Sequence, residues 1–331
     1  MSVFKQSESY RPFQYPWAAE AAKTHAVDMF WDTHQIELQD DLRQYNTAGG
    51  LATKDVSHET NKFILKKLVT VFTEMDRTVA GGYIDLLPYI GNNEIKTMLL
   101  TFAARETVHQ RGYALAAETF GFSDKEWTEF ADYAEMREKL EIMAHSASTG
   151  RPEYRAAVKL ATILCGEGIG LFGAFAVLLN FKRQGLLMGF NDVNQWSLVD
   201  EQDHVENNIR VFLAMLPDLT EAERWRLRTV VEEIIKAYVA AEHRFITLIY
   251  QMGNQQDLTE TELMDYISYL GELRLFQLGY LDIDLVRNNP IPWMEWMLSA
   301  GRHDNFFEKR VTDYSHNKLP GTIDYSRYSL K

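Results

Sequence analysis

Two copies of the pattern Glu-x-x-His lie 95 residues apart in this chain, as Glu106 with His109 and as Glu201 with His204. An embedded carboxylate precedes each copy: Asp76 lies 30 residues before the first, and Glu167 lies 34 residues before the second. Side chains three positions apart share one face of a helix, so each pattern directs a carboxylate and an imidazole to the same side. Four carboxylates and two imidazoles are what a four-helix bundle needs to hold two metal ions in its core. The spacing therefore predicts an all-helical fold around a dinuclear metal site.

Glu167 is the most informative of the carboxylates because its segment, ATILCGEGIGLFGAFAVLL, is almost entirely apolar or glycine. A buried carboxylate is costly unless it is paired, protonated or bound to a metal. Taken alone, a neutral or hydrogen-bonded core glutamate explains Glu167 as well as a metal ligand does. The repetition of the whole arrangement favours the ligand.

Two other sequence features compete with the proposed ligands. Glu74 competes with Asp76 as the first ligand, but Asp76 shares the more apolar helix face with Phe72 and Val79. The sequence Asp-Val-Ser-His at 55–58 has the same spacing as the two patterns. It lies at a predicted helix start, where Ser57 is a good cap, so we expect a structural or surface role for His58. We expect most of the other histidines outside the two patterns to be surface or capping residues as well.

Carboxylate and imidazole ligands without a thiolate suit iron or manganese better than structural zinc. Redox chemistry with dioxygen is then the expected use of the pair. Tyr113 follows His109 by four residues, about one helical turn, and is expected on the ligand face. A phenol beside an oxidising metal pair can lose an electron and a proton, and Leu171, Phe172 and Phe175 could keep it dry. The alternative is an ordinary core tyrosine whose hydroxyl bonds to a ligand.

Composition indicates which kind of protein, partner and cellular compartment to expect. Hydrophobic residues make up 46% of the chain and the net charge is −13, so a packed globule is expected and a nucleic-acid partner is not. Cys165 is the single cysteine, which excludes a disulfide framework and fits a reducing compartment. The N-terminal residues lack the apolar core of a signal peptide, and the longest apolar run, 168–179, is too short to span a bilayer. We predict a soluble cytoplasmic protein.

Helical periodicity and cap residues predict nine helices and no sheet. Ser57, Ser123, Thr220 and Thr259 are the expected N-caps. The expected helices span about 17–47, 58–81, 93–119, 124–145, 152–183, 193–215, 221–253 and 260–288, and a short ninth follows Pro292. No linker divides the body, so residues 1–305 are predicted to form one domain. Residues 306–331 are polar without an apolar stripe, which predicts a flexible C-terminal tail.

Several segments resemble the small, radical-generating subunit of class I ribonucleotide reductase. They are FTEMDRTVAGGY, FAARETVHQRGY, CGEGIGLFGAFA, LVDEQDH and NFFEKRVTDYS, together with Trp31 in DMFWDTHQIEL. The resemblance spans residues 72–315 and implies a ferritin-like bundle with additional helices. It implies that Asp76, Glu106 and His109 bind one metal ion, that Glu167, Glu201 and His204 bind the other, and that Tyr113 carries the radical.

The resemblance also implies a long-range transfer path and a partner. Trp31 matches the tryptophan near the start of the path, and Asp200 matches the aspartate that bonds both this tryptophan and the first metal's histidine. Tyr314 matches the tail tyrosine that passes the radical to the large subunit; Tyr325 and Tyr328 are weaker candidates. Two iron ions, or manganese, would act with dioxygen to oxidise Tyr113, and the large (alpha) subunit would use the radical to reduce ribonucleotides to deoxyribonucleotides. The resemblance further implies a homodimer that docks through its tail.

Two departures bear on details. The first carboxylate is Asp in some relatives and Glu in others, so Asp76 does not decide the metal, and the basic C-terminus differs from the acidic or aromatic ends of many relatives.

Other functions share such bundles. A ferritin would be shorter and lack the tail, and a diiron oxygenase or oxidase acting on its own substrate would need an open pocket but neither Trp31 nor Tyr314. A purely structural bundle would not bury six ligand-type groups together.

Overall fold

The computed structural model describes residues 2–299, with only the backbone of residues 130 and 131, and within that range the chain forms helices and no β-strand. The α-helices are α1 (Pro16–Lys23), α2 (Gln39–Asn46), α3 (His58–Leu86), α4 (Asn93–Thr119), α5 (Asp124–Thr128), α6 (Ala134–Met143), α7 (Pro152–Cys165), α8 (Phe172–Arg183), α9 (Met188–Met215), α10 (Glu221–Ile249) and α11 (Glu260–Gln277). Two π-helices, Thr24–Asp28 and Gly166–Gly170, and five short 3₁₀-helices lie between or after them. Residues 293–299 are also helical, which agrees with the short helix predicted after Pro292. The predicted all-α class is confirmed.

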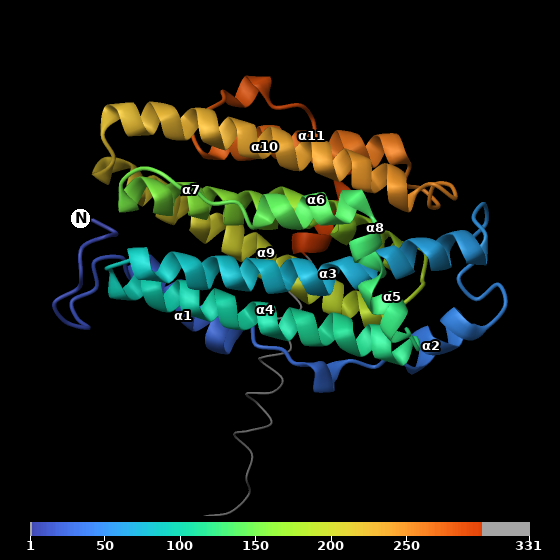
Figure 1. Cartoon of the computed structure of the whole chain (residues 1–331). Helices are drawn as coiled ribbons and strands as arrows, with labels where there is room; N and C mark the ends of the chain where they lie inside the picture. The colour runs from blue at the N-terminus through green and yellow to red at the C-terminus, as the bar shows by residue number, and fades with distance from the viewer. Residues whose placement is uncertain (1, 300–331) are drawn as a thin grey trace, which may run out of the picture.

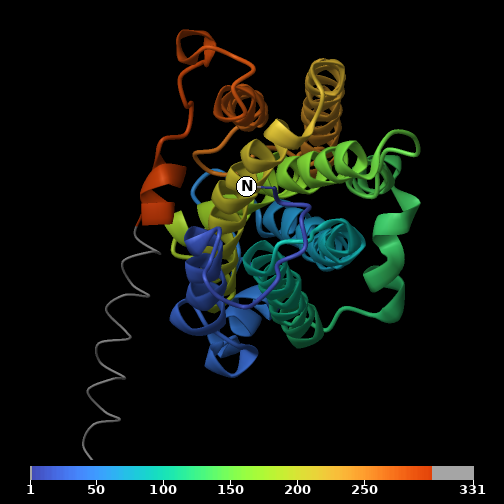
Figure 2. The ribbon, with the colours of Figure 1, turned by 90° about the vertical axis from the view of Figure 1, so that its left-hand side faces the viewer.

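Four long segments form the central bundle. Helix α3 packs on α4, α4 on α9, α9 on α7, and α7 back on α3, so these helices close into a ring. Helices α3 and α4 lie side by side along the length of the molecule in Figure 1, and the view along the bundle in Figure 2 shows how the neighbouring helices surround them. Helices α10 and α11 add a further layer over α7 and α8, while α1 covers α4 and α2 covers α9. The interior of the ring is therefore enclosed by protein.

The predicted caps explain where several helices begin. The Ser57 side chain accepts a bond from the backbone of Thr60, and Ser123, Thr220 and Thr259 each form a reciprocal capping box with the glutamate three residues on. Such caps satisfy backbone donors that the first helical turn leaves unpaired. Helix α4 has the bounds that the sequence predicts, and Gly121 follows it with a positive φ of 76°.

The structure corrects two predicted helices that were too continuous. The first breaks between Asp28 and Gln39, where an extended segment carries Trp31 across the bundle. The fourth is interrupted by the 3₁₀-helix Glu129–Asp132. Short amphipathic segments of this kind keep a helical pattern even when tertiary packing bends the chain, so periodicity alone did not reveal the breaks.

Three helix ends also differ from expectation. Helix α3 continues through Gly81 and Gly82 to Leu86, because Gly82 allows Ile163 of α7 to approach to 3.1 Å of where a Cβ would lie. Helix α9 starts at Met188, earlier than predicted, since Asp41 accepts bonds from the backbone of Gly189 and Phe190. Helix α11 ends at Gln277, well before residue 288.

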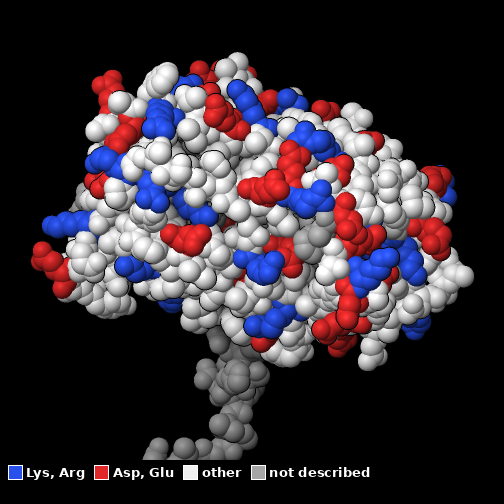
Figure 3. Space-filling view, in the orientation of Figure 1, with Lys and Arg blue, Asp and Glu red and all other residues white. Residues whose placement is uncertain are grey.

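The segment Pro152–Arg183 is long and apolar enough to cross a membrane, but its most apolar 18-residue window is wholly buried inside the fold. It forms the central helices of the bundle, as the burial of α7 and α8 shows. On the outer face seen in Figure 3, acidic and basic side chains are interspersed rather than separated into patches of one sign.

Candidate metal centre

The six predicted metal ligands come from all four walls of the ring. Asp76 lies on α3, Glu106 and His109 on α4, Glu167 on the π-helix, and Glu201 and His204 on α9; each is at most 1% exposed. The competitor Glu74 instead points outward and forms an ion pair with Arg77. The preference for Asp76 over Glu74 as the inward carboxylate agrees with this placement.

Glycines create the unusual backbone at Glu167. Gly166 and Gly168 flank it, and Gly170 ends the π-helix. A Cβ on Gly168 would come within 2.6 Å of Arg274, and one on Gly170 within 3.2 Å of Tyr238. The glycines thus allow neighbouring side chains to pack directly on the backbone. A single π turn widens a helix and redirects its side chains, and such turns are frequent at functional sites.

The ligand atoms form two overlapping groups, each with atoms within 4.8 Å of one another. One group contains Asp76, Glu106, His109 and Glu201, and the other contains Glu106, Glu167, Glu201 and His204. Glu106 and Glu201 belong to both. His109 Nδ1 lies 3.0 Å from Glu201 Oε1, and His204 Nδ1 lies 3.2 Å from Glu106 Oε1. This sharing is what two adjacent metal ions with bridging carboxylates require.

The polar atoms at this centre also fit cations. Buried atoms without a hydrogen-bond partner are costly, and native proteins contain few of them. In this protein a group of them lies together at the centre: Asp76 Oδ2, both carboxylate oxygens of Glu106 and of Glu201, and Nδ1 of His109 and His204. A pair of divalent cations would satisfy all of these atoms at once. The cluster therefore has the composition and geometry of a dimetal site.

Without a metal ion, the cluster holds protons. Burial, reinforced by Glu106, raises the pKa of Asp76 well above its usual value, and burial raises the pKa of Glu167 to about 7. Burial opposes charge on His109 and His204 too, but the surrounding carboxylates raise the pKa of both imidazoles well above 6.5. A metal ion must displace such protons when it binds.

Tyr113 lies in a dry aromatic pocket beside this cluster. Its hydroxyl donates to Asn194 Oδ1 at 3.2 Å, and burial, together with the charge of Asp76, raises the pKa of the phenol well above 10. Phe72 stacks on its ring at 4.6 Å, and Phe190 packs edge-on at 5.9 Å.

The residues predicted to keep Tyr113 dry lie farther out. Leu171, Phe172 and Phe175 are all buried, and Phe175 packs on Phe72, the ring that in turn covers Tyr113. The immediate shielding comes from Phe72 and Phe190, which belong to α3 and α9.

Trp31 and His109 are linked through Asp200. Trp31 Nε1 donates to Asp200 Oδ2 at 2.9 Å, and the same oxygen lies 3.0 Å from His109 Nε2. The two rings also stack, 5.7 Å apart at 11°. Gly112 allows Val193 to pack closely on α4 beside Trp31, because a Cβ there would lie 2.8 Å from Val193. Asp200 thus orients the imidazole that faces the cluster with its other nitrogen.

With this geometry established, comparison with known proteins becomes informative. The family model described as "Ribonucleotide reductase, small chain" matches residues 7–288. The chain belongs to the ribonucleotide reductase small-chain family. It is 30% identical to the probable ribonucleoside-diphosphate reductase small subunit of Invertebrate iridescent virus 3, over 95% of this chain and 85% of that protein. It is 23% identical to the ribonucleoside-diphosphate reductase subunit beta of Chlamydia pneumoniae, over 92% of this chain and 88% of the relative.

Solved structures show the same fold. The ribonucleotide reductase R2 subunit from Clostridium botulinum superposes with a TM-score of 0.75 at 17% identity, covering 88% of this chain and 91% of that one. The Rnr4 homodimer from Saccharomyces cerevisiae gives a TM-score of 0.71 at 18% identity, covering 95% and 92%. The predicted bundle with additional helices is the fold of these small subunits.

Sequence reasoning missed three residues that contact the centre of this small-chain fold. Tyr83 bonds to Glu167, and Arg105 Nε lies 3.0 Å from Asp200 Oδ2. Beside burial, which opposes it, Arg105 and His109 lower the pKa of Asp200 to about 2. The expectation of a surface role was wrong for His25, which is 2% exposed, bonds to Asp203 at 2.7 Å and packs 4.8 Å from the His204 ring. Its partners lie far away in sequence, so no local spacing identified it.

The structure describes His58 but not Tyr314. His58 accepts a bond from the backbone of Leu51 at the start of α3, which is the structural role expected for it. Tyr314 lies outside the described residues, as do Tyr325, Tyr328 and the predicted tail.

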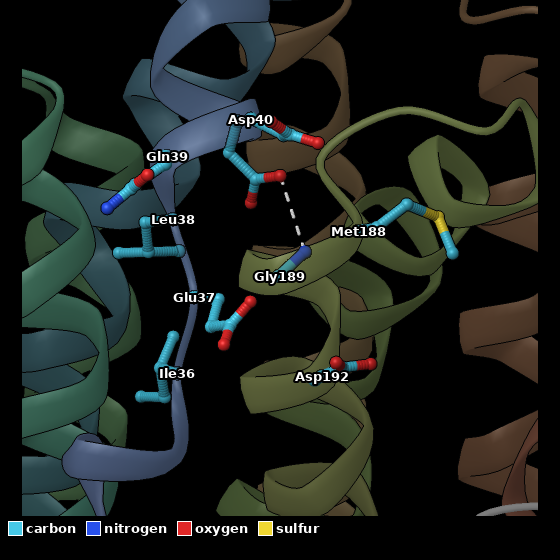
Figure 4. A pocket seen from close by; sticks show the side chains of 9 residues that line it. Ile36, Glu37, Leu38, Gln39, Asp40, Met188, Gly189 and Asp192 are labelled. Carbon is cyan, nitrogen blue, oxygen red and sulfur yellow. Dashed lines mark hydrogen bonds between the residues drawn. The ribbon is translucent and has the colours of Figure 1, made fainter.

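The surface pocket of Figure 4 is separate from the metal centre. It has a volume of about 570 Å³ and lies between residues 36–41 and the start of α9. Carboxylates of Glu37, Asp40, Asp41 and Asp192 line it without a histidine. The dashed bond runs from the backbone of Gly189 to Asp41. This hydrogen bond is structural, because it fixes the beginning of α9, the helix that carries Glu201 and His204.

Proposed function

We propose that this chain is the metal-loaded, radical-generating subunit of a class I ribonucleoside-diphosphate reductase. The observation that carries the proposal is the buried six-ligand cluster with Tyr113 on one side and the link through Asp200 to Trp31 on the other. Asp76, Glu106 and His109 would hold one ion, and Glu167, Glu201 and His204 the other. Iron suits this donor set, and manganese suits it too.

When bound, two redox-active cations supply, together with dioxygen, the oxidising equivalents needed to take an electron from a phenol. Tyr113 is the phenol we assign to this role. Its pKa is raised by burial, so it is neutral before oxidation and must lose its proton together with the electron. The stacked Phe72 and the edge-on Phe190 exclude water and reductants from the ring. Such exclusion is what a persistent radical needs.

Trp31 and Tyr314 are proposed as steps of the transfer to the large subunit. Trp31 is 3% exposed and joined to His109 by a shared hydrogen-bond acceptor and by ring stacking, so it lies in direct contact with the centre. Tyr314 would lie in the segment 306–331, which we propose as the docking tail on the body formed by residues 1–305. The proposed partners are the large subunit and a second copy of this chain, in the cytoplasm; the similar yeast Rnr4 structure is that of a homodimer.

The second candidate is a diiron oxidase or oxygenase acting on its own substrate. Such an enzyme needs a cavity that leads to the ligands. Four of the surface pockets among the described residues have none of the six ligands in their lining. One of them, about 380 Å³ in volume, is lined by His25 and Arg105, which contact residues of the centre, but by none of the six ligands. The enclosed centre and the contact with Trp31 favour the reductase subunit.

The deciding experiment combines the iron-loaded, oxygen-treated chain with the large subunit of a class I reductase and measures deoxyribonucleotide formation. Turnover that requires both proteins and the metal is the expected result. Absence of turnover with every suitable large subunit, together with metal-dependent oxidation of a small molecule by this chain alone, would favour the oxidase.

Replacing Tyr314 with phenylalanine separates radical formation from its use. We expect Tyr314→Phe to form the radical at wild-type yield, because the substitution leaves the six proposed ligands and Tyr113 unchanged. Deoxyribonucleotide formation should fall to background, since phenylalanine offers no oxidisable hydroxyl for the transfer. Spin counting and a turnover assay on the same sample test both parts, and full turnover would remove Tyr314 from the path.

Metal binding should weaken as the pH falls. The pKa of Glu167 is raised to about 7, and the pKa of Asp76 is also raised, so both carboxyls bind protons more readily than ordinary carboxyls do. Protons therefore compete with the metal below that range, and affinity should fall by about tenfold per pH unit for each proton displaced. Manganous-ion titrations at pH 6 and pH 8 test the sign. Equal affinity at both values would contradict the proton-holding cluster.

A further inference from the structure

A second tyrosine contacts the metal centre on the side of Glu167. Tyr83 of α3, Glu167 of the π-helix and Asn208 of α9 form a closed triangle of hydrogen bonds, and none of the three is measurably exposed. The Tyr83 hydroxyl lies 2.6 Å from Glu167 Oε1 and 2.8 Å from Oε2. Asn208 Nδ2 lies 2.7 Å from the Tyr83 hydroxyl and 2.9 Å from Glu167 Oε2.

The direction of each bond follows from the chemistry of the groups. The Asn208 amide has two N–H groups, which it donates to the Tyr83 oxygen and to Glu167 Oε2. The Tyr83 hydroxyl accepts one of them and so donates its own hydrogen to the carboxylate. The single Tyr83 hydrogen is shared between Glu167 Oε1 and Oε2, and Asn208 donates to Oε2. Oε1 also faces the second ligand group, 3.3 Å from His204 Nδ1. Bonds of this kind to a carboxylate are short and strong.

The two halves of the centre are oriented by different devices. In the first, the histidine is held: His109 Nε2 bonds to Asp200. In the second, His204 Nε2 has no hydrogen-bond partner and packs against the rings of Phe102 and His25. In the second half, the Glu167 carboxylate is fixed instead, by hydrogen bonds from Tyr83 and Asn208. No comparable pair of donors acts on Asp76, whose Oδ2 is without a partner.

We infer that Tyr83 and Asn208 are positioning residues for the second metal ion. Together they hold the Glu167 carboxylate in one orientation, in which Oε1 faces His204 of the same ligand group. The ion is a divalent cation of the iron or manganese class, and the inference rests on the proposed two-metal function. Because Glu167 lies on a glycine-rich π-helix, the helix backbone alone constrains the carboxylate less than a regular helix would.

The test is a titration with manganous ion, which reports on binding without dioxygen chemistry. Metal-free wild type, Tyr83→Phe and Asn208→Ala are titrated by calorimetry, and free ion is counted by its paramagnetic signal. We expect two ions per wild-type chain. In either variant the first ion should bind within about twofold of wild type, and the second about 10- to 100-fold more weakly, as is typical when an orienting partner of a ligand is removed. Tyr83→Phe keeps the ring and its packing.

Tyr250→Phe is the matched control. Tyr250 is also a buried tyrosine, and its hydroxyl bonds to Gln255 rather than to a predicted ligand. It should bind both ions as wild type does. The double variant Tyr83→Phe/Asn208→Ala should lose less affinity than the product of the single losses, because Asn208 acts partly through the Tyr83 hydroxyl.

The titrations distinguish failure of the two-metal function from failure of the positioning role of Tyr83 and Asn208. If wild type binds fewer than two ions, the two-metal function itself fails. If wild type binds two ions and the variants bind the second equally well, or bind both ions equally weakly, the positioning role is overturned and a merely structural one remains. Thermal melting of the metal-free proteins identifies a misfolded variant, in which case the other single variant decides.

Discussion

Replacing Tyr113 with phenylalanine will abolish the tyrosyl radical that iron and dioxygen generate in this chain, while two iron ions remain bound. Tyr113 is fully buried, lies in a pocket of aromatic rings and is close enough to Asp76 for that carboxylate to raise its pKa. Phenylalanine preserves the packing but removes the hydroxyl, whose proton must leave when the ring is oxidised. The absorption and the paramagnetic signal of the radical should both fall to background.

Tyr238→Phe controls for the loss of a buried hydroxyl near the centre. Tyr238 is fully buried, and its hydroxyl bonds to the backbone oxygen of Thr162 instead of a predicted ligand. This variant should form the radical normally. A persistent tyrosyl signal in Tyr113→Phe would move the radical to another tyrosine, for which the contact between Tyr83 and Glu167 makes Tyr83 the first residue to replace.

The second large effect concerns a buried ion pair outside the metal centre. Lys139 of α6 and Glu242 of α10 lie 2.6 Å apart, and both side chains are inaccessible to solvent. The Lys139 ammonium also lies 4.0 Å from the Phe245 ring centre. Burial lowers the pKa of Lys139 and raises that of Glu242, and each partner opposes the shift of the other. The pair therefore remains stable only while both charges are present.

Glu242→Leu should destabilise the fold by about 3–5 kcal/mol, because it leaves the Lys139 charge buried without its partner. The double variant Lys139→Met/Glu242→Leu should recover most of that loss, since apolar residues of similar volume often replace a buried pair without cost. Chemical denaturation of the three proteins measures the difference, with Arg244→Ala as the surface control that removes the exposed pair with Glu138. Equal stability of the single and the double variants would show that Lys139 finds another partner or loses its proton.

The ligands of the metal centre were predictable because each pair of them follows local geometry. Glu106 with His109 and Glu201 with His204 lie one turn apart on regular helices, and a spacing of three has one structural meaning there. The embedded carboxylates were recognisable by contrast, since a charged group in an apolar stretch needs a partner. The six side chains do meet in the structure, and their role as ligands stays a prediction until metal is measured.

What could not be predicted depends on contacts between distant segments. His25 meets Asp203, and Tyr83 meets Asn208, across more than one hundred residues. The breaks in the first and fourth predicted helices have the same origin, because the helical pattern continues through them while packing bends the chain. Gly82 was taken as near a helix end but serves a close helix contact with Ile163. Local patterns do not contain this information.

Helix α9 places Asp200, Glu201 and His204 within a little more than one turn. Its first turn is fixed from outside the bundle by Asp41. A rotation of this helix would displace Glu201 from the cluster and, in the same movement, weaken the hydrogen bond between Asp200 and Trp31. Under the proposed function, a chain whose metal ligands are misplaced would therefore also lose the contact between Trp31 and the metal centre. Under this proposal, such a chain would also lack the path by which an oxidising equivalent leaves the centre.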